Sequence, residues 1–294
     1  MKNNALAVVF ALSAVAMWST VATAFKLSLQ LMSLLQLLTG ASFFSLLVLS
    51  LCLCIQGDLG KALKTLPESL RSVVLLALLN PVLYYIVLLE AYAILPAQVA
   101  QSINYTWAIT LTVLSVPLLG HRLTRSDLAA IFLGYLGVVC ISFSGKNIAG
   151  ELSYWGVFLA LFSTLIWAGY WLINARDPRP PLIKLFQSFL LAVPVLLVIT
   201  LVYEGMPNAM NIKQFAGMAY IGLFEMGLAF ICWQMAMHYT DRVSQVGTLI
   251  FLSPFISLFI INKVLGEPLQ ILTFVGLILI VVGILIQQFM GRKT

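Results

Sequence analysis

Two carboxylic acids interrupt apolar stretches of the sequence in which ionisable side chains are otherwise rare. Glu90 and Glu225 each stand inside a run of apolar residues. Placing an ionisable group in hydrocarbon costs about 3 kcal/mol on insertion scales and more in simulations, so both residues are functional candidates. A carboxylate at that depth can bind the ammonium group of a solute, exchange a proton, or hold a neighbouring helix by a hydrogen bond. The residue types alone leave these three roles open.

The surroundings of the two acids differ. Glu225 lies well inside its run, and Gly222, Ala229 and Ala236 recur on the same helical face at steps of three, four or seven residues. Small residues allow close helix packing in a membrane, so this face is expected to point into a bundle. Glu90 lies near the end of its run and is expected to reach the membrane interface. We name both as candidates for proton coupling, and Glu225 also for substrate binding.

Aromatic rings and amides form a second group of candidates, most clearly at Asn104-Tyr105-Thr106-Trp107. Rings beside amides can line a cavity that stacks a planar solute and hydrogen-bonds its polar end. Trp171 and His238 are instead interpreted as interfacial, because both are expected near the ends of helices. The remaining candidates for cavity lining are Asn104, Tyr105, Trp107, Trp167, Tyr170, Trp233 and Gln245.

The chain that must position these residues has 294 residues, of which 62% are hydrophobic and 9% charged. A soluble domain would need more polar surface. Runs of about 20 apolar residues span a bilayer as helices, because lipid cannot satisfy exposed backbone groups. The sequence therefore predicts an all-α membrane protein. The expected spans are residues 4–26, 31–55, 71–94, 96–119, 126–145, 152–174, 182–203, 215–238, 243–263 and 270–290.

The first of these spans also has the marks of a signal peptide. Lys2 precedes it, and Ala22-Thr23-Ala24 imitates a cleavage site. The run continues beyond that point and contains Trp18, which has a counterpart in the second half of the chain, so we expect a retained first span. The four cysteines fall inside apolar runs without metal-ligand spacing, and no Walker motif is present. Neither cofactor nor metal is predicted.

The net charge of +6 is interpreted as a topology signal. The basic residues flank the spans instead of forming a patch, so nucleic acid is not an expected partner. Positive residues favour the cytoplasmic side, which places both termini in the cytoplasm. The expected outer group is Lys26, Lys146, Lys213 and Lys263; the expected inner group is Lys2, Lys61, Lys64, Arg71, Arg122, Arg125, Arg176, Arg179, Lys184, Arg242, Arg292 and Lys293.

Matching residues in the two halves predict an internal repeat. Gln98-Val99 and Gln245-Val246 are 147 positions apart and occupy equivalent places in halves of five spans each. Because five is odd, the second half must enter the bilayer from the opposite side, as in many secondary transporters. The predicted repeats cover residues 1–147 and 148–294. Further pairs at similar offsets are Trp18 with Trp167, Gly120 with Gly266, and Gly137 with Gly283.

With these residues in view, the chain resembles the drug/metabolite transporter superfamily, in the branch of EamA-type carriers with ten spans. The resemblance covers essentially the whole chain. Three motifs carry it: Trp18-Ser19-Thr20 followed by Lys26, Trp167-Ala168-Gly169-Tyr170, and Ser253-Pro254 followed by Gly266-Glu267-Pro268. Within that branch, Ile103-Asn104-Tyr105-Thr106-Trp107 and Phe230-Ile231-Cys232-Trp233 are similar to bacterial aromatic amino-acid exporters.

The resemblance implies a multi-pass carrier of the bacterial inner membrane that exports aromatic or other amino acids, or similar amphipathic metabolites, by alternating access. Protons are a candidate coupling ion, and the expected state is a monomer or homodimer. A central cavity lined by spans one, three, four, six, eight and nine is implied, and it would contain Trp18, Asn104, Tyr105, Trp107, Trp167, Tyr170 and Trp233. The chain departs from the pattern at His121-Arg122, where the second repeat has Glu267-Pro268, and at Ala108, where the exporters have proline.

Three alternatives stay open at this point. A drug or nucleotide-sugar exporter of the same superfamily is disfavoured because phosphate would call for Lys or Arg within the spans. An intramembrane enzyme would need a nucleophile with a deep histidine, or paired acids for a metal; both histidines are expected near helix ends, and the two acids at different depths. A non-transporting interaction protein is expected to have a solidly packed centre.

Overall fold

The structure is a computed structural model that describes residues 2–120, 123–149, 151, 153–205, 210–241 and 243–290. Within these helices, the side chains of Leu119, Lys146, Asn147, Ala149, Val243, Ser244, Gln245 and Met290 are outside the description. The described part is helical throughout its spans. The helices are α1 Asn4–Leu29, α2 Leu34–Gln56, α3 Leu59–Lys64, α4 Leu70–Ala77, α5 Tyr84–Ile94, α6 Ala97–Asn104, α7 Trp107–Leu119, α8 Arg125–Ala149, α9 Tyr154–Arg176, α10 Pro181–Glu204, α11 Ile212–Tyr220, α12 Ala229–Tyr239, α13 Val243–Thr248, α14 Leu252–Leu265 and α15 Ile271–Met290.

Nine helices in the described residues are long and apolar enough to cross a membrane, by length and composition. They correspond to nine of the ten expected spans. The exception is the span expected at residues 96–119, which the structure divides into α6 and α7 by a turn at Tyr105 and Thr106. Together the two short helices cross the bundle once, so the predicted ten-crossing fold is confirmed with its fourth crossing broken.

Irregular segments recur at matching places in the two halves. A π-helical segment, Leu78–Leu83, joins α4 to α5, and another, Ile221–Leu228, joins α11 to α12. The turn between α6 and α7 is matched by a 3₁₀ segment, Leu249–Phe251, between α13 and α14. Gly120 and Gly266 end α7 and α14 in the same left-handed conformation, with φ of 70° and 71°, which a side chain would disfavour.

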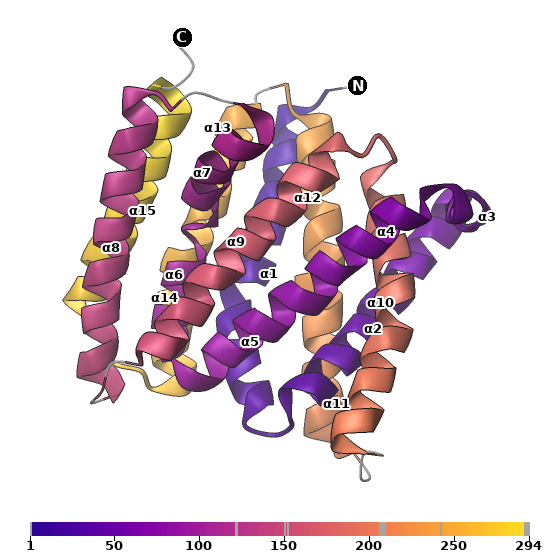
Figure 1. The fold of residues 1–294 in the computed structure, drawn as a ribbon, viewed down its shortest axis with the longest axis horizontal. Coiled ribbons are helices and arrows are strands. Elements are labelled where there is room, and N and C mark those ends of the chain that lie inside the picture. The colour runs from indigo at the N-terminus through magenta and orange to yellow at the C-terminus, as the bar shows by residue number, and fades with distance from the viewer. Residues whose placement is uncertain are drawn as a thin grey trace.

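The packing of the helices follows the same symmetry. In the first half α1 packs against α12 and α14, and in the second half α9 packs against α5 and α7. Figure 1 shows that α1 and α9 begin at opposite edges of the bundle, as an inverted repeat requires. The expected two-repeat architecture is therefore confirmed, whereas the boundary between residues 147 and 148 stays a prediction.

Glycines bring α8 and α15 together. A Cβ added to Gly137 would lie 2.5 Å from the carbonyl oxygen of Gly276, and one added to Gly276 would lie 2.5 Å from that of Gly137. A Cβ on Gly283 would lie 3.0 Å from the carbonyl oxygen of Ala130. Small residues give this close backbone approach in a membrane bundle. Both described contacts therefore cross between the repeats along one helix pair.

The bundle has two edges that the site depends on. We call the edge where α1 begins and α15 ends the termini edge, and the opposite edge, where α6 begins and α14 ends, the far edge (Figure 1). At the termini edge Lys2 Nζ donates to the carbonyl oxygen of His238 at 2.8 Å. The backbone amide of Asn3 donates to the carbonyl oxygen of Tyr239, also at 2.8 Å. These bonds fix the start of α1 to the end of α12.

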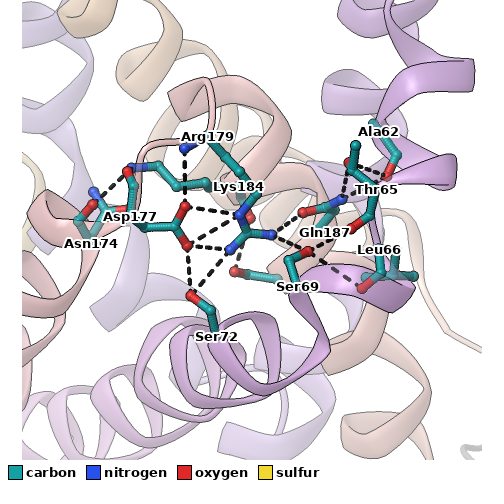
Figure 2. A network of polar contacts seen from close by, with 11 residues as sticks. Ala62, Thr65, Leu66, Ser69, Ser72, Asn174, Asp177, Arg179, Lys184 and Gln187 are labelled. Carbon is teal, nitrogen blue, oxygen red and sulfur yellow. Dashed lines mark hydrogen bonds and ion pairs between the residues drawn. The ribbon is translucent and has the colours of Figure 1, made fainter.

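A polar network after α9, which we call the loop clamp, joins the two repeats (Figure 2). Its centre is an ion pair between Arg179 and Asp177. The Asp177 carboxylate also accepts from Ser72 Oγ, at 2.6 Å, and Arg179 Nη1 donates to Ser69 Oγ, at 2.8 Å, and to Gln187. Hydrogen bonds from the Arg179 guanidinium, with those from Ser72, hold the pKa of Asp177 well below its usual range.

Candidate functional site

A cavity of about 740 Å³ lies between the two repeats. Its lining includes residues from the first, third, fourth, sixth, eighth and ninth membrane spans, as the resemblance implied. Asp127 of α8, in the fifth span, and the end of α15, in the tenth, also contribute. The cavity brings together seven of the sequence candidates. They are Trp18, Asn104, Tyr105, Trp107, Trp167, Glu225 and Trp233.

Glu225 is the deepest acid of this lining. It lies in the π-helical segment before α12 and is 8% exposed. The hydroxyl of Tyr85 donates to its Oε1 at 3.0 Å, while Oε2 has no hydrogen-bond partner among the described residues. An unpaired acceptor at such burial is costly, and π segments frequently occur at functional sites. The arrangement leaves one carboxylate oxygen available to a solute or a proton.

Aromatic rings form the walls around this acid. The ring of Trp18 lies 5.7 Å from that of Trp233 and 5.7 Å from that of Phe230, with the second pair edge to face. The ring of Phe230 also lies 6.0 Å from that of Trp167, and Tyr84 stacks on Trp167 with a centroid distance of 4.4 Å. Ring faces accommodate flat apolar groups and attract cations. The walls therefore suit a planar solute that carries an ammonium group.

Amides supply the polar part of the lining at α6. Asn104 is held by the protein at both ends: Tyr84 Oη donates to its Oδ1 at 3.2 Å, and its Nδ2 donates to Ser163 Oγ at 2.9 Å. Gln101, one turn earlier, is 5% exposed, and its Oε1 has no partner among the described residues. Asn104 thus fixes the ring of Tyr84, whereas the side-chain oxygen of Gln101 remains without a donor in the described part of the chain.

Three candidates lie elsewhere. Tyr170 is buried behind the wall, with its ring 5.3 Å from that of Trp167, and is outside the lining. Glu90 is exposed on α5 and is also outside the lining. Gln245 belongs to α13, but its side chain is outside the described residues; its neighbour Gly247 lines the cavity.

Several lining residues were not predicted from the sequence. Trp171 was interpreted as interfacial, yet it lines the cavity and stacks on Trp107 at 6.5 Å. Tyr84 of the lining donates to Asn104, and Tyr85, which is outside the lining, donates to Glu225. Both follow Pro81 in the span that matches the one holding Glu225. Their place beside a helix-breaking proline was the available sequence signal. His238, also interpreted as interfacial, is exposed near the end of α12.

The two ends of the cavity differ. At the termini edge the lining includes Asp127, Ala175 and Gln287, which belong to the first or last turns of α8, α9 and α15. Toward the far edge the lining stops at Phe25 and Tyr92, whose rings lie 5.3 Å apart. Beyond them the start of α6 is buried, with Gln98 1% exposed. The cavity therefore reaches the termini edge and is closed at the far edge.

The comparisons with known proteins agree with this architecture. The model of the EamA-like transporter family matches residues 5–143 and again residues 154–287. The chain is 28% identical over 211 residues to "Uncharacterized transporter YvbV" of Bacillus subtilis, covering 71% of this chain and 68% of the relative. It is 24% identical over 239 residues to an "Uncharacterized transporter" of Archaeoglobus fulgidus, covering 78% and 80%.

A solved structure described as "Crystal structure of protein" has the same fold. It matches with a TM-score of 0.67 over 98% of both chains, at 18% sequence identity. The family model covers most of this chain in two successive copies, which correspond to the two halves that surround the cavity. The chain is a multi-pass membrane protein that belongs to the EamA-like transporter family.

Proposed function

We propose that this protein is a secondary transporter of the bacterial inner membrane that exports small amphipathic metabolites, aromatic or other amino acids, by alternating access. The observation that supports the proposal most is the cavity itself. Its volume of about 740 Å³ falls in the range of small-molecule sites. It lies between inverted repeats and reaches one edge of the bundle, which is the arrangement of carriers with a central site.

The lining provides separate places for the parts of such a solute. The carboxylate of Glu225 binds the ammonium group, because its Oε2 faces no protein donor among the described residues. The rings of Trp167 and Trp233 cover the flat apolar part, and the amide of Gln101 binds a polar group. A proton can occupy the same carboxylate oxygen once the solute has left, which would couple efflux to a proton gradient.

The direction of transport follows from charge. Of the expected inner group, Lys2 precedes α1, Arg125 begins α8 and Arg176 ends α9, and these helix ends lie at the termini edge, which supports a cytoplasmic position for that edge. The structure then corresponds to a conformation that takes up solute from the cytoplasm. Export requires a second conformation in which the far edge opens and the termini edge closes.

The alternatives have less support. A phosphate-bearing solute would need a cation, and the described lining contains the acids Asp127 and Glu225 but neither Lys nor Arg. A solid centre would have favoured a non-transporting interaction protein; a large cavity favours a carrier. An enzyme of the rhomboid type would need a deep histidine, and His238 is exposed at a helix end.

Efflux from liposomes tests the proposal. Purified protein is reconstituted into liposomes loaded with radiolabelled Phe, Tyr, Trp, Thr or Cys, and release is followed with and without a pH gradient. We expect faster release of the aromatic solutes than from protein-free liposomes, and acceleration by the gradient if protons are coupled. Release at the protein-free rate for every solute would refute the proposal.

A further inference from the structure

The far edge is closed by a carboxylate that one repeat donates to a helix of the other. Glu267 follows α14, and its Oε1 accepts from the backbone amide of Ala97 at 2.6 Å, while its Oε2 accepts from that of Gln98 at 3.2 Å. The side-chain amide of Gln98 donates to the same Oε2, at 3.3 Å, and to the carbonyl oxygen of Pro268, at 3.0 Å. We call these four contacts the Glu267 latch.

The start of α6 depends on this carboxylate. The first amides of a helix have no partner within it, and a side chain usually caps them. Pro96 precedes α6 and provides no side-chain hydrogen bond, so the amides of Ala97 and Gln98 bond to Glu267 instead. A negative charge at this end also complements the helix dipole. The contact is thus a helix cap supplied from 169–170 residues away.

The residues around the latch hold its two sides in place. Gly266 ends α14 in a left-handed conformation, and Asn262 Nδ2 donates to the carbonyl oxygen of Glu267 at 2.9 Å. On the other side Ala97 is fully buried and Gln98 is 1% exposed. Lys26 near the end of α1 interacts electrostatically with Glu267. Glu267 is therefore held in place by its neighbours at the end of α14, and the start of α6 by its burial.

The latch controls a helix that lines the cavity. α6 has eight residues and is separated from α7 by the turn at Tyr105 and Thr106, so it can tilt without bending a longer helix. Gln101 and Asn104 of α6 line the cavity. Movement of the start of α6 away from Glu267 would open the cavity toward the far edge.

We propose that Glu267 is a positioning residue of the transport cycle, whose carboxylate latches α6 and stabilises the conformation closed at the far edge. The inference rests on the proposed transport function. The latch also makes the two halves unequal, because the position of the first repeat that corresponds to Glu267 is His121, which is not an acid. The closed far edge is then favoured over the closed termini edge by a carboxylate that has no corresponding acid in the sequence of the first repeat.

Cysteine accessibility tests the latch without measuring transport. The background variant has its four native cysteines (Cys52, Cys54, Cys140 and Cys232) replaced by serine, and Gln101→Cys then places a thiol in the deep part of the cavity. A membrane-impermeant maleimide is added to right-side-out and to inside-out vesicles. With Glu267 intact, we expect rapid labelling from the termini edge and slow labelling from the far edge.

Glu267→Gln should raise the rate of labelling from the far edge about tenfold, because the neutral amide has one acceptor oxygen for the amides of α6. Glu204→Gln is the matched control: Glu204 is an exposed acid at the end of α10, at the same edge, and it accepts from Ser33 outside the cavity. We expect it to leave the labelling rate unchanged. Equal rates for the two variants would overturn the proposal.

A second variant keeps the test decisive if Glu267→Gln does not fold. Gln98→Ala removes the two side-chain contacts and retains the bonds that the backbone amides of residues 97 and 98 donate to the carboxylate, so we expect an increase of about threefold in far-edge labelling. An unchanged rate in a folded Gln98→Ala protein would contradict the latch. Efflux failing for all solutes would instead refute the transport function, and would leave the labelling result as evidence for a structural cap alone.

Discussion

Two acids of this protein, one in the loop clamp and one in the cavity, differ in how completely their oxygen atoms are bonded. The side chain of Asp177 in the loop clamp is 6% exposed, and both of its oxygens accept hydrogen bonds, from Arg179 and Ser72. Glu225 in the cavity is 8% exposed and accepts one bond, from Tyr85. A fully bonded acid contributes to the stability of a fold, whereas an acid of a cavity lining that keeps an unpaired oxygen is a candidate for binding or proton exchange. The difference in hydrogen bonding therefore distinguishes the acid of the clamp from the acid of the cavity.

The largest expected effect is that of Glu225→Gln on transport. The amide keeps the hydrogen bond from Tyr85 but loses the charge that binds an ammonium group or a proton, so we expect efflux to fall about 100-fold, corresponding to the loss of a charge-assisted bond. The melting temperature should stay the same or rise, because a neutral group is less costly to bury. Efflux and thermal denaturation are measured on one preparation. Unchanged efflux with an unchanged pH response would remove Glu225 from the mechanism.

Arg179→Met should have the opposite effects, with reduced stability and unchanged transport. It leaves Asp177 buried without its cation, and we expect a loss of about 2–3 kcal/mol of stability. The efflux rate per folded molecule should be unchanged, because the clamp lies outside the cavity lining. Thermal denaturation in detergent gives the first quantity. The double variant Asp177→Asn, Arg179→Met removes both charges and should recover part of the loss; no recovery would contradict the ion-pair explanation.

Tyr84→Phe is expected to have a small effect on both stability and transport. It keeps the ring that stacks on Trp167 and removes the hydroxyl that donates to Asn104. Loss of one neutral hydrogen bond should cost about 1 kcal/mol of stability and change the half-saturation concentration by less than about threefold. Tyr84→Leu, which also removes the ring, should raise that concentration further. Equal effects of both substitutions would show that the ring does not contribute to solute binding.

The smallest effect near neutral pH is that of protonation at the loop clamp. The pKa of Asp177 is lowered in the folded protein, first by the hydrogen bonds from Arg179. A lowered pKa contributes stability that is complete above the unfolded value of about 3.9 and is lost as the pH falls through the folded value. Between pH 7 and 5 we therefore expect no contribution to the change in melting temperature from this group. Asp177→Asn should lower the melting temperature at pH 7 and reduce its further decline below pH 4; an identical decline would contradict this assignment.

The sequence was sufficient for the spans because hydrocarbon imposes a strict length and composition on helices. It was insufficient for the breaks. The turn at Tyr105 and Thr106 follows a stretch with several polar residues, including Gln98, Gln101 and Asn104, but their presence does not mark the residue at which the helix divides, which depends on packing between helices. The π-helical segments were not predicted either, although Pro81 indicated a helix break in one of them.

The site was predictable where burial alone implies a cost, and less so where a contact is distant. Glu225 was identified by its depth, but its partner Tyr85 lies 140 residues away. Glu267 was noted as a difference between the repeats, while its bonds to α6 depend on the folded arrangement. The contribution of α15 to the lining was also missed, because Gln287 lies near the end of an otherwise apolar helix, where a polar side chain is equally compatible with the membrane interface.

The glycine contact between α8 and α15 has a consequence for the integrity of the cavity. With backbone against backbone at Gly137 and Gly276, neither an acyl chain nor a water molecule fits between these two helices, whose ends contribute Asp127 and Gln287 to the lining. At this contact the two helices therefore leave no gap through which the cavity could open to the side. A leucine at position 276 would wedge the helices apart and let detergent or lipid tails enter from the side.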